Sequence, residues 1–362
     1  MVYACARQNH FCKSFDLGKM AKRNLIIIAL VLVAVAAISH YSSKRSIKNS
    51  DDKIGKPIVD SALFENIDGI VLTQAEHTTE LEKKGDQWQV KIKGGFPTDM
   101  EKLLKLLEKV SSYTISSLVT KDADRMGDFE TYYKGEENAT TENSGYQLTL
   151  KQGSETVFKV VIGKVRTSSS QNLGSGGTYI RLGDPKVVYL IKETLVFESN
   201  PQTWLQSKLF SVEKDHVKSV SFNIKDKTFS FEREDKDKKF KLNDLKKSET
   251  LDSKPLSGVI NDLNDFAIED IKAHSDQFVK GLKKASVATI DLFDGKKIKF
   301  EVLYSVKKTG KDEVKSYFVK FHPETESFDK GVVELNQKWL FTVEGWKIKK
   351  WFKAREEYLK DK

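Results

Sequence analysis

The residue types that most often carry out chemistry in proteins are present in this sequence, but their spacing matches no familiar catalytic or metal-binding motif. A metal site usually places two histidines or two cysteines a few positions apart. Here the histidines after residue 50 are more than 45 positions from one another, and the only cysteines are Cys5 and Cys12. Serines are abundant, but no Gly-x-Ser-x-Gly nucleophile motif occurs. We therefore predict no catalytic residue, no metal ligand and no cofactor, and expect a protein that is not an enzyme.

A glycine- and serine-rich stretch could hold an anion. Residues 167–179 read TSSSQNLGSGGTY, and the backbone N–H groups of such loops bind phosphate when a helix amino terminus follows them. The residues that follow here, TYIRL, have the composition of a strand. This order favours a hairpin loop over a phosphate site.

The strongest candidate for a contact with another molecule lies at the carboxy terminus. Residues 346–362 combine aromatic and basic side chains with helical propensity, so we predict a cationic amphipathic helix there. Its candidate partner or membrane contacts are Trp346, Lys347, Lys349, Lys350, Trp351 and Phe352. Such a helix could lie on a membrane surface or dock on a partner. Alternatively, its aromatic face packs against the preceding domain.

An apolar run near the amino terminus indicates how the protein is held in the cell. Leu25 to Ile38 are 14 apolar residues, which as a helix span about 21 Å. Flanking residues as far as Tyr41 can extend this helix into the membrane interface. We therefore predict a transmembrane anchor over residues 25–41, and a cleaved secretory signal is the alternative.

The charges beside this run predict its orientation. Lys22 and Arg23 precede it, so residues 1–24 should be cytoplasmic and the bulk of the chain periplasmic or extracytoplasmic. The protein is then a single-pass protein of the inner (cytoplasmic) membrane. Met20 begins a more ordinary leader than Met1, and residues 1–19 could stem from a misplaced start.

The overall charge argues against a nucleic-acid partner. The net charge is +9, and +4 of it precedes the apolar run. The remaining lysines alternate with nearly as many acidic residues, whereas nucleic-acid binders concentrate their positive charge on one patch.

The rest of the chain predicts a tether followed by two similar units. Residues 42–62 are polar and charged, as in a flexible tether. Residues 63–198 and 199–345 repeat one order of strand and helix patterns, which indicates tandem units. We predict an α+β fold in which each unit is an antiparallel sheet covered by a helix.

Each predicted unit contains one amphipathic helix. The first is expected to begin after Thr98, with Glu101 as its partner in a capping box. The second is expected to begin at Ser253, with Pro255 in its first turn. The two apolar stripes share one spacing at an offset of 156 residues: Met100, Leu103, Leu104, Leu107 and Val110, and then Leu256, Val259, Ile260, Leu263 and Phe266.

Alternating apolar and polar residues predict the strands. Hairpins are expected over 78–92 and 145–163 in the first unit and over 227–242 and 287–305 in the second. Two closing strands follow in each unit, TYIRL and KVVYLI in the first, SYFVKF and GVVEL in the second. The polar segment 122–144, present only in the first unit, is predicted to be a surface loop.

The segment TWLQSKLF joins the two predicted units, and we predict that Trp204 makes an interdomain contact. A cleft between the units offers an alternative function. Such a cleft could bind cell-envelope polysaccharide or peptidoglycan through Trp204, Tyr179 and lysines.

Several motifs resemble a known family. QWQV before FPTDMEKLLKLLEKV, then SSLVTKD, FKVVIGK, GTYIRLGDPKVVYLI and TWLQSKLF, are similar to domain-of-unknown-function family 4340 over most of residues 60–345. Many members are encoded beside ABC transporters of the gliding-motility and auxiliary type. The resemblance implies an accessory or scaffold protein of a membrane complex such as an ABC transporter, with an integral membrane protein as partner, and it supplies no catalytic residues.

Overall fold

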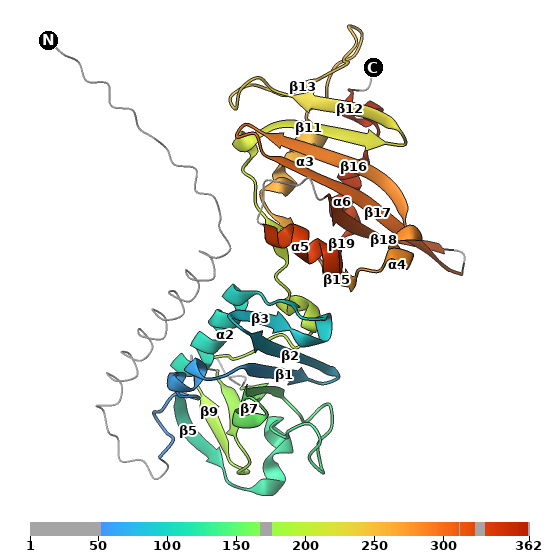
Figure 1. The fold of residues 1–362 in the computed structure, drawn as a ribbon. Coiled ribbons are helices and arrows are strands. Elements are labelled where there is room, and N and C mark those ends of the chain that lie inside the picture. Colours follow the sequence, from blue (N-terminus) through green and yellow to red (C-terminus); the bar gives the residue numbers. More distant parts are fainter. Residues whose placement is uncertain (1–51, 167–175, 311, 323–329, 361–362) are drawn as a thin grey trace, which may run out of the picture.

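The computed structural model describes residues 52–166, 176–310, 312–322 and 330–360. The predicted anchor over 25–41, the segment before it, residues 42–51 of the tether and most of the glycine- and serine-rich stretch lie outside these ranges. Within them, no helix is both long and apolar enough to cross a membrane. The fold is mixed α/β, with mainly antiparallel sheets and few helices (Figure 1).

The first sheet has nine strands in the order β4-β3-β2-β1-β6-β7-β8-β9-β5. They are β1 (Gly69–Gln74), β2 (His77–Lys84), β3 (Gln87–Val90), β4 (Phe96–Pro97), β5 (Ile115–Thr120), β6 (Tyr146–Gln152), β7 (Glu155–Val165), β8 (Thr178–Leu182) and β9 (Val188–Ile191). Side chains alternate between the two faces: Ile70 and Leu72 are fully buried, whereas Val71 is partly exposed. Helix α2 (Met100–Ser112) packs Leu103 and Val110 into the same core. The hairpins predicted over 78–92 and 145–163 are confirmed.

Helix α2 begins one residue later than predicted. Its N-cap is Asp99, whose carboxylate accepts a hydrogen bond from the Lys102 backbone N–H at 3.0 Å. Thr98 cannot serve as the cap because it forms a β-bridge with Leu205. Glu101 pairs with Lys105 instead of closing a capping box.

The segment 122–144 is more than the predicted polar surface loop. Its side chains Met126, Phe129 and Tyr132 are buried with Val188 in a small core of their own. The buried Arg181 of β8 donates to both carboxylate oxygens of Glu136, at 2.7 and 2.8 Å. This bidentate pair fixes the segment to the sheet.

The second sheet has eight strands in the order β13-β12-β11-β16-β17-β18-β19-β15. They are β11 (Val217–Ile224), β12 (Lys227–Glu232), β13 (Lys241–Leu242), β15 (Asp270–Ala273), β16 (Lys283–Leu292), β17 (Lys297–Thr309), β18 (Asp312–Phe321) and β19 (Trp339–Val343). The helices around it are α3 (Lys254–Leu263), α4 (Asp276–Lys280), α5 (Lys330–Lys338) and α6 (Gly345–Ile348). Helix α3 begins after Ser253, as predicted, and buries Leu256, Val259, Ile260 and Leu263.

The predicted closing strand GVVEL is wrong, because these residues lie in α5, and β19 is the closing strand. Val332 and Asn336 are four residues apart and both buried, so they share one helix face. The Asn336 side-chain oxygen accepts a hydrogen bond from the Phe321 N–H at the end of β18, at 3.1 Å. These tertiary contacts outweigh the strand propensity of the valine pair.

The single helix predicted over 346–362 is also wrong. The structure has α6 followed by two short 3₁₀ turns, Lys349–Phe352 and Arg355–Tyr358, separated by extended backbone. Trp351 and Tyr358 pack against Phe222 in the core of the second sheet. These aromatic residues therefore pack against the preceding domain, which is one of the two predicted alternatives.

Aromatic contacts and an ion pair join the sheets. Phe96 of β4 meets Trp339 of β19 edge to face, with ring centroids 5.3 Å apart. Lys93 donates to both carboxylate oxygens of Asp270 in β15, at 2.7 and 2.8 Å. Figure 1 accordingly shows β15, β19 and α5 facing the first sheet.

Candidate functional site

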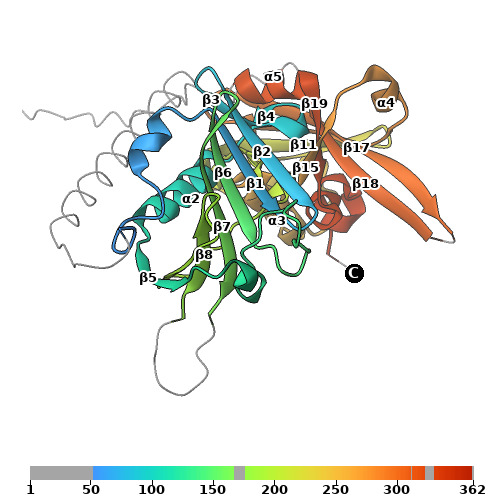
Figure 2. The same ribbon diagram turned by 90° about the horizontal axis from the view of Figure 1, so that it is seen from below.

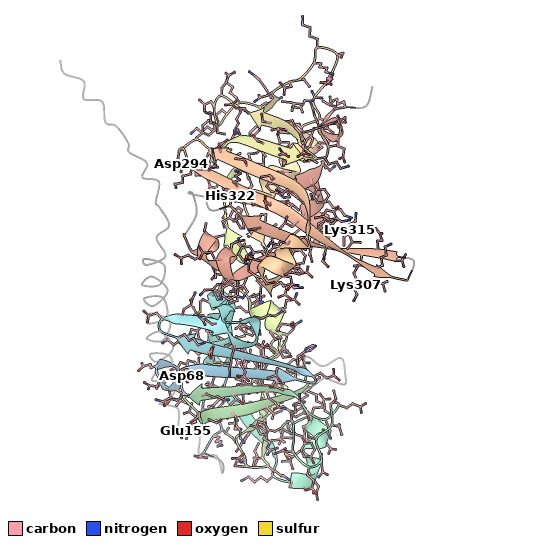
Figure 3. All side chains as sticks on the ribbon, turned by 45° about the vertical axis from the view of Figure 1, so that its right-hand side comes forward. Asp68, Glu155, Asp294, Lys307, Lys315 and His322 are labelled. Atoms are coloured by element: carbon pink, nitrogen blue, oxygen red, sulfur yellow. The ribbon has the colours of Figure 1, made fainter. Side chains whose placement is uncertain are left out.

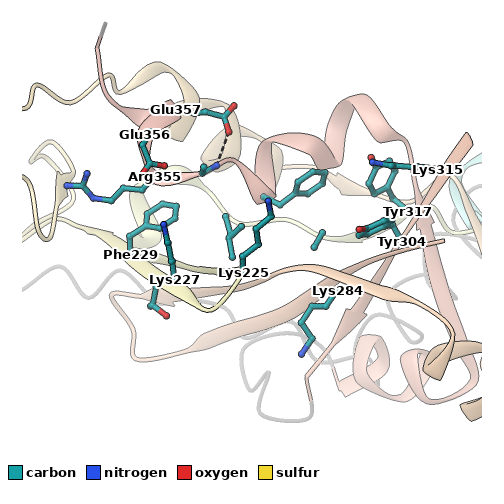
Figure 4. A pocket seen from close by; sticks show the side chains of 15 residues that line it. Lys225, Lys227, Phe229, Lys284, Tyr304, Lys315, Tyr317, Arg355, Glu356 and Glu357 are labelled. Atoms are coloured by element: carbon teal, nitrogen blue, oxygen red, sulfur yellow. Dashed lines mark hydrogen bonds between the residues drawn. The ribbon is translucent and has the colours of Figure 1, made fainter. Parts of the chain in front are cut away.

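A groove beside the second sheet is the candidate functional site. It has a volume of about 590 Å³ and lies where the β11–β12 hairpin, the start of β16, the β17–β18 pair and the carboxy-terminal turns meet (Figure 4). Its lining includes Lys225, Lys227, Phe229, Lys284, Tyr304, Lys315, Tyr317, Phe352, Arg355, Glu356 and Glu357. The groove is therefore mainly cationic and aromatic.

Two of the lysines are placed by a tight turn. Ile224 and Lys227 form the last pair of the β11–β12 ladder, so Lys225 and Asp226 are the two central turn residues. Both have positive φ, at 49° and 62°, as a two-residue hairpin loop requires. Strand β11 pairs with β16 only as far as Asn223, which lies opposite Val287, whereas β16 begins at Lys283. The turn therefore lies beside the start of β16, where Lys225 and Lys227 line the groove.

Three groove lysines make no ion pair with any acidic residue in the described part of the chain: Lys225, Lys227 and Lys315. The other two cationic side chains form ion pairs with acidic residues that do not line the groove. Lys284 pairs with Glu301 at 2.8 Å. Arg355 donates to both oxygens of Glu249, at 3.1 and 2.7 Å.

The aromatic side chains form one end of the groove. Tyr304 and Tyr317 face each other across β17 and β18, with ring centroids 6.2 Å apart. Phe352 stacks on Tyr317 at 5.6 Å, and the Lys315 ammonium lies 5.5 Å from the Tyr304 ring centroid. Tyr304 and Phe352 remain partly exposed and so offer ring surface to a ligand.

The opposite wall carries two carboxylates. Glu357 accepts a hydrogen bond from the Ala354 N–H at 2.8 Å, the contact drawn as a dashed line in Figure 4. Glu356 is exposed. The hydrogen bonds from Arg355 and from the Lys246 N–H lower the pKa of the neighbouring Glu249 to about 2, so the pair that fixes this wall is ionised at neutral pH.

The β17–β18 pair extends from the groove as a two-stranded ribbon, residues 305–316. Strand β16 pairs with β17 only as far as Tyr304, and β19 pairs with β18 only from Tyr317. Among the described residues, the two arms pair only with each other beyond these positions, and they project from the molecule (Figure 2). Lys307 and Lys315 lie on this ribbon (Figure 3), and Val314 is 53% exposed.

The predicted contact residues at the carboxy terminus differ in exposure: some are exposed and others are buried. Trp346 is 69% exposed and Lys349 is exposed, whereas Trp351 is 1% exposed. Asp262 of α3 accepts from the Lys350 ammonium at 2.7 Å and from the Trp351 indole N–H at 3.2 Å. The Lys347 ammonium lies over the Trp346 ring at 5.3 Å, and Phe352 lines the groove.

Trp204 is 1% exposed and lies at the end of a short 3₁₀ turn, Pro201–Trp204. Its indole N–H donates to the Glu198 carbonyl at 2.7 Å, and its carbonyl accepts from the Asp99 N–H. These hydrogen bonds tie it to the side of the first sheet. Tyr179, the other aromatic residue predicted for a cleft between the units, packs on Phe129 at 4.7 Å.

Sequence reasoning missed the groove because its lysines come from three separate elements. A weak signal was the polar turn Lys225-Asp226 between two alternating segments. Across the described ranges, no three His, Cys, Asp or Glu side chains are grouped so as to hold a metal ion.

Comparison with known proteins gives one match. A family model described as Domain of unknown function (DUF4340) matches residues 88–285. No curated protein and no solved structure matches the chain.

Proposed function

The chain belongs to the DUF4340 family, and from that premise we propose that it is a non-enzymatic accessory or scaffold protein of a membrane complex such as an ABC transporter. In this proposal, residues 25–41 anchor the chain in the cytoplasmic membrane and the described residues lie outside the cytoplasm. The partner is an integral membrane protein, which docks on the ribbon and on the adjacent Trp346.

The ribbon is the observation that carries this proposal. The outer edges of its arms are unpaired backbone, which another polypeptide can extend as an added strand. Gly345, beside Trp346, lies against the Tyr317 ring at the base of the ribbon. An exposed tryptophan next to an open strand edge is typical of a surface that another protein covers.

We also propose that the chain contains two copies of one α+β unit, residues 63–198 and 199–345. The order of strands supports this. The first sheet contains β3-β2-β1-β6-β7-β8-β9-β5 and the second contains β13-β12-β11-β16-β17-β18-β19-β15, which is the same succession along the chain. A scaffold built from two such units can hold the anchor and the ribbon at separate places.

Site-specific photo-crosslinking tests the docking proposal. A photoreactive residue replaces the exposed Val314 of the ribbon in the full-length protein, in its native membrane, and another replaces the exposed Lys247 as a control. The proposal expects an integral membrane protein crosslinked from position 314 and not from position 247. Identical crosslink patterns from the two positions, or none from 314, would contradict it.

The rival function, polymer binding in a cleft between the units, is less well supported at Trp204 than the docking role is at the ribbon. Trp204 is almost completely buried and offers a ligand no ring face.

A further inference from the structure

We propose that the groove beside the second sheet binds an anionic polysaccharide, a chain of sugar rings that carries carboxylate or phosphate groups. This proposal goes beyond the docking role of the ribbon and does not depend on it. The groove is lined by other residues than those that join the two sheets.

The charge of the groove favours a negative ligand. Lys225, Lys227 and Lys315 are directed to the groove without an acidic partner in the described part of the chain, while Lys284 and Arg355 are paired from outside. Three unpaired ammonium groups in one concave site raise the local concentration of anions.

The spacing of these lysines favours an extended ligand. Lys225 and Lys227 come from the β11–β12 hairpin, and Lys315 lies with the two tyrosines at the other end of the groove (Figure 4). A polymer with repeated negative groups can pair with the lysines at both ends.

The aromatic side chains favour sugar rings between these charges. Tyr304 and Phe352 expose part of their rings, and Tyr317 lies between them through its contacts with both. A sugar ring has an apolar C–H face that packs on an aromatic ring, and its hydroxyl groups remain free for hydrogen bonds at the edge.

The acidic wall distinguishes a glycan from other polyanions. The exposed Glu356 carboxylate can accept hydrogen bonds from sugar hydroxyls. An acidic peptide of Asp and Glu has no hydroxyl donors and only one backbone N–H per residue, so it offers Glu356 fewer hydrogen-bond donors than a sugar ring does. An anionic lipid surface is flat and cannot place its headgroups along a recessed groove.

Binding of defined polymers to the full-length protein in detergent tests the proposal. The probes are polygalacturonate for carboxylate, phosphorylated dextran for phosphate, and neutral dextran. Poly-glutamate and vesicles of anionic phospholipid represent the rival ligands. Saturable binding of either anionic glycan, tighter than that of all three others, is the expected result, and the tighter of the two identifies the charged group.

Variants locate the site. The triple substitution Lys225→Gln, Lys227→Gln and Lys315→Gln should weaken glycan binding by about tenfold or more and reduce the dependence of affinity on salt. The control replaces three exposed lysines elsewhere, Lys109, Lys164 and Lys247, with glutamine and should leave the affinity unchanged. Tyr304→Ala should weaken binding without changing the salt dependence.

Several results would overturn the proposal. One is the absence of saturable binding to both anionic glycans. Another is an equal loss of affinity in the control triple variant, which would assign binding to general positive charge. Poly-glutamate or vesicles binding as tightly as the glycans would assign the groove to a different class of ligand.

Discussion

Two arginines show how single residues hold the outer segments of this fold. Arg181 is buried, and besides its fork to Glu136 it donates to the carbonyls of Thr131, Pro185 and Asp184. Burial alone would raise the pKa of Glu136, but the hydrogen bonds from Arg181 and from the Tyr133 N–H outweigh it and lower that pKa. One guanidinium thus donates to four acceptor groups, the Glu136 carboxylate and three backbone carbonyls.

Removal of that guanidinium should loosen segment 122–144. Arg181→Ala removes the guanidinium hydrogen bonds to the Glu136 carboxylate and to three carbonyls, and we expect a cost of about 3–5 kcal/mol in the free energy of unfolding. Urea unfolding measures the cost, and hydrogen exchange should accelerate first within 122–144. Arg125→Ala breaks an exposed pair with Asp128 and should cost less than about 1 kcal/mol; equal effects of the two variants would refute the assigned role.

The pair of Arg355 with Glu249 predicts a dependence on pH. The folded state lowers the pKa of Glu249 from 4.5 to about 2. The ionised pair therefore stabilises the fold above the ordinary carboxyl pKa, and this contribution is lost as pH falls toward about 2.

Glu249→Gln tests this dependence. The variant should melt at a lower temperature than the wild type near neutral pH, and the difference should shrink as pH falls below the ordinary carboxyl pKa and vanish only below about pH 2, where both side chains are uncharged. Thermal unfolding of both proteins across this pH range is the measurement. A difference that stays constant with pH would show that the charge of Glu249 does not matter.

At the scale of elements, the ribbon should be dispensable for folding. Its exposed arms pair only with each other. Replacement of residues 305–316 by Asn-Gly closes the hairpin directly between Tyr304 and Tyr317 with a favourable turn. The melting temperature should change by less than about 2 °C, and a large loss of stability would mean that the ribbon has a structural role.

Elements with a regular pattern could be predicted from the sequence, and those decided by distant contacts could not. The hairpin 145–163 and the start of α3 at Ser253 follow from local alternation and from Pro255 in the first turn. Helix α5 depends on the contact between Asn336 and β18, which no local pattern reports. The groove needs lysines from separate elements, and their lack of acidic partners is set only by the fold.

At the scale of the whole molecule, the contact between the two sheets rests on an aromatic cluster with an ion pair beside it. Phe96 is fully buried and lies near both Trp339 and Phe341. The Lys93–Asp270 pair is about three-quarters buried.

Phe96→Ala should weaken this contact. The lost aromatic packing should cost about 3–5 kcal/mol, and the radius of gyration in small-angle X-ray scattering should rise as the two halves separate. Asp270→Asn, which removes the charge and keeps the shape, serves as the milder control. An unchanged radius in Phe96→Ala would show that other contacts hold the halves together.

Quantitative affinity capture tests the docking role most directly. Full-length wild type and the Asn-Gly ribbon variant are recovered from gently solubilised native membranes, and the proteins retained with each are compared by mass spectrometry. We predict that an integral membrane protein, such as a transporter subunit, is enriched with the wild type and lost with the variant. Recovery of the same membrane proteins with both chains, or of none with the wild type, would contradict the account.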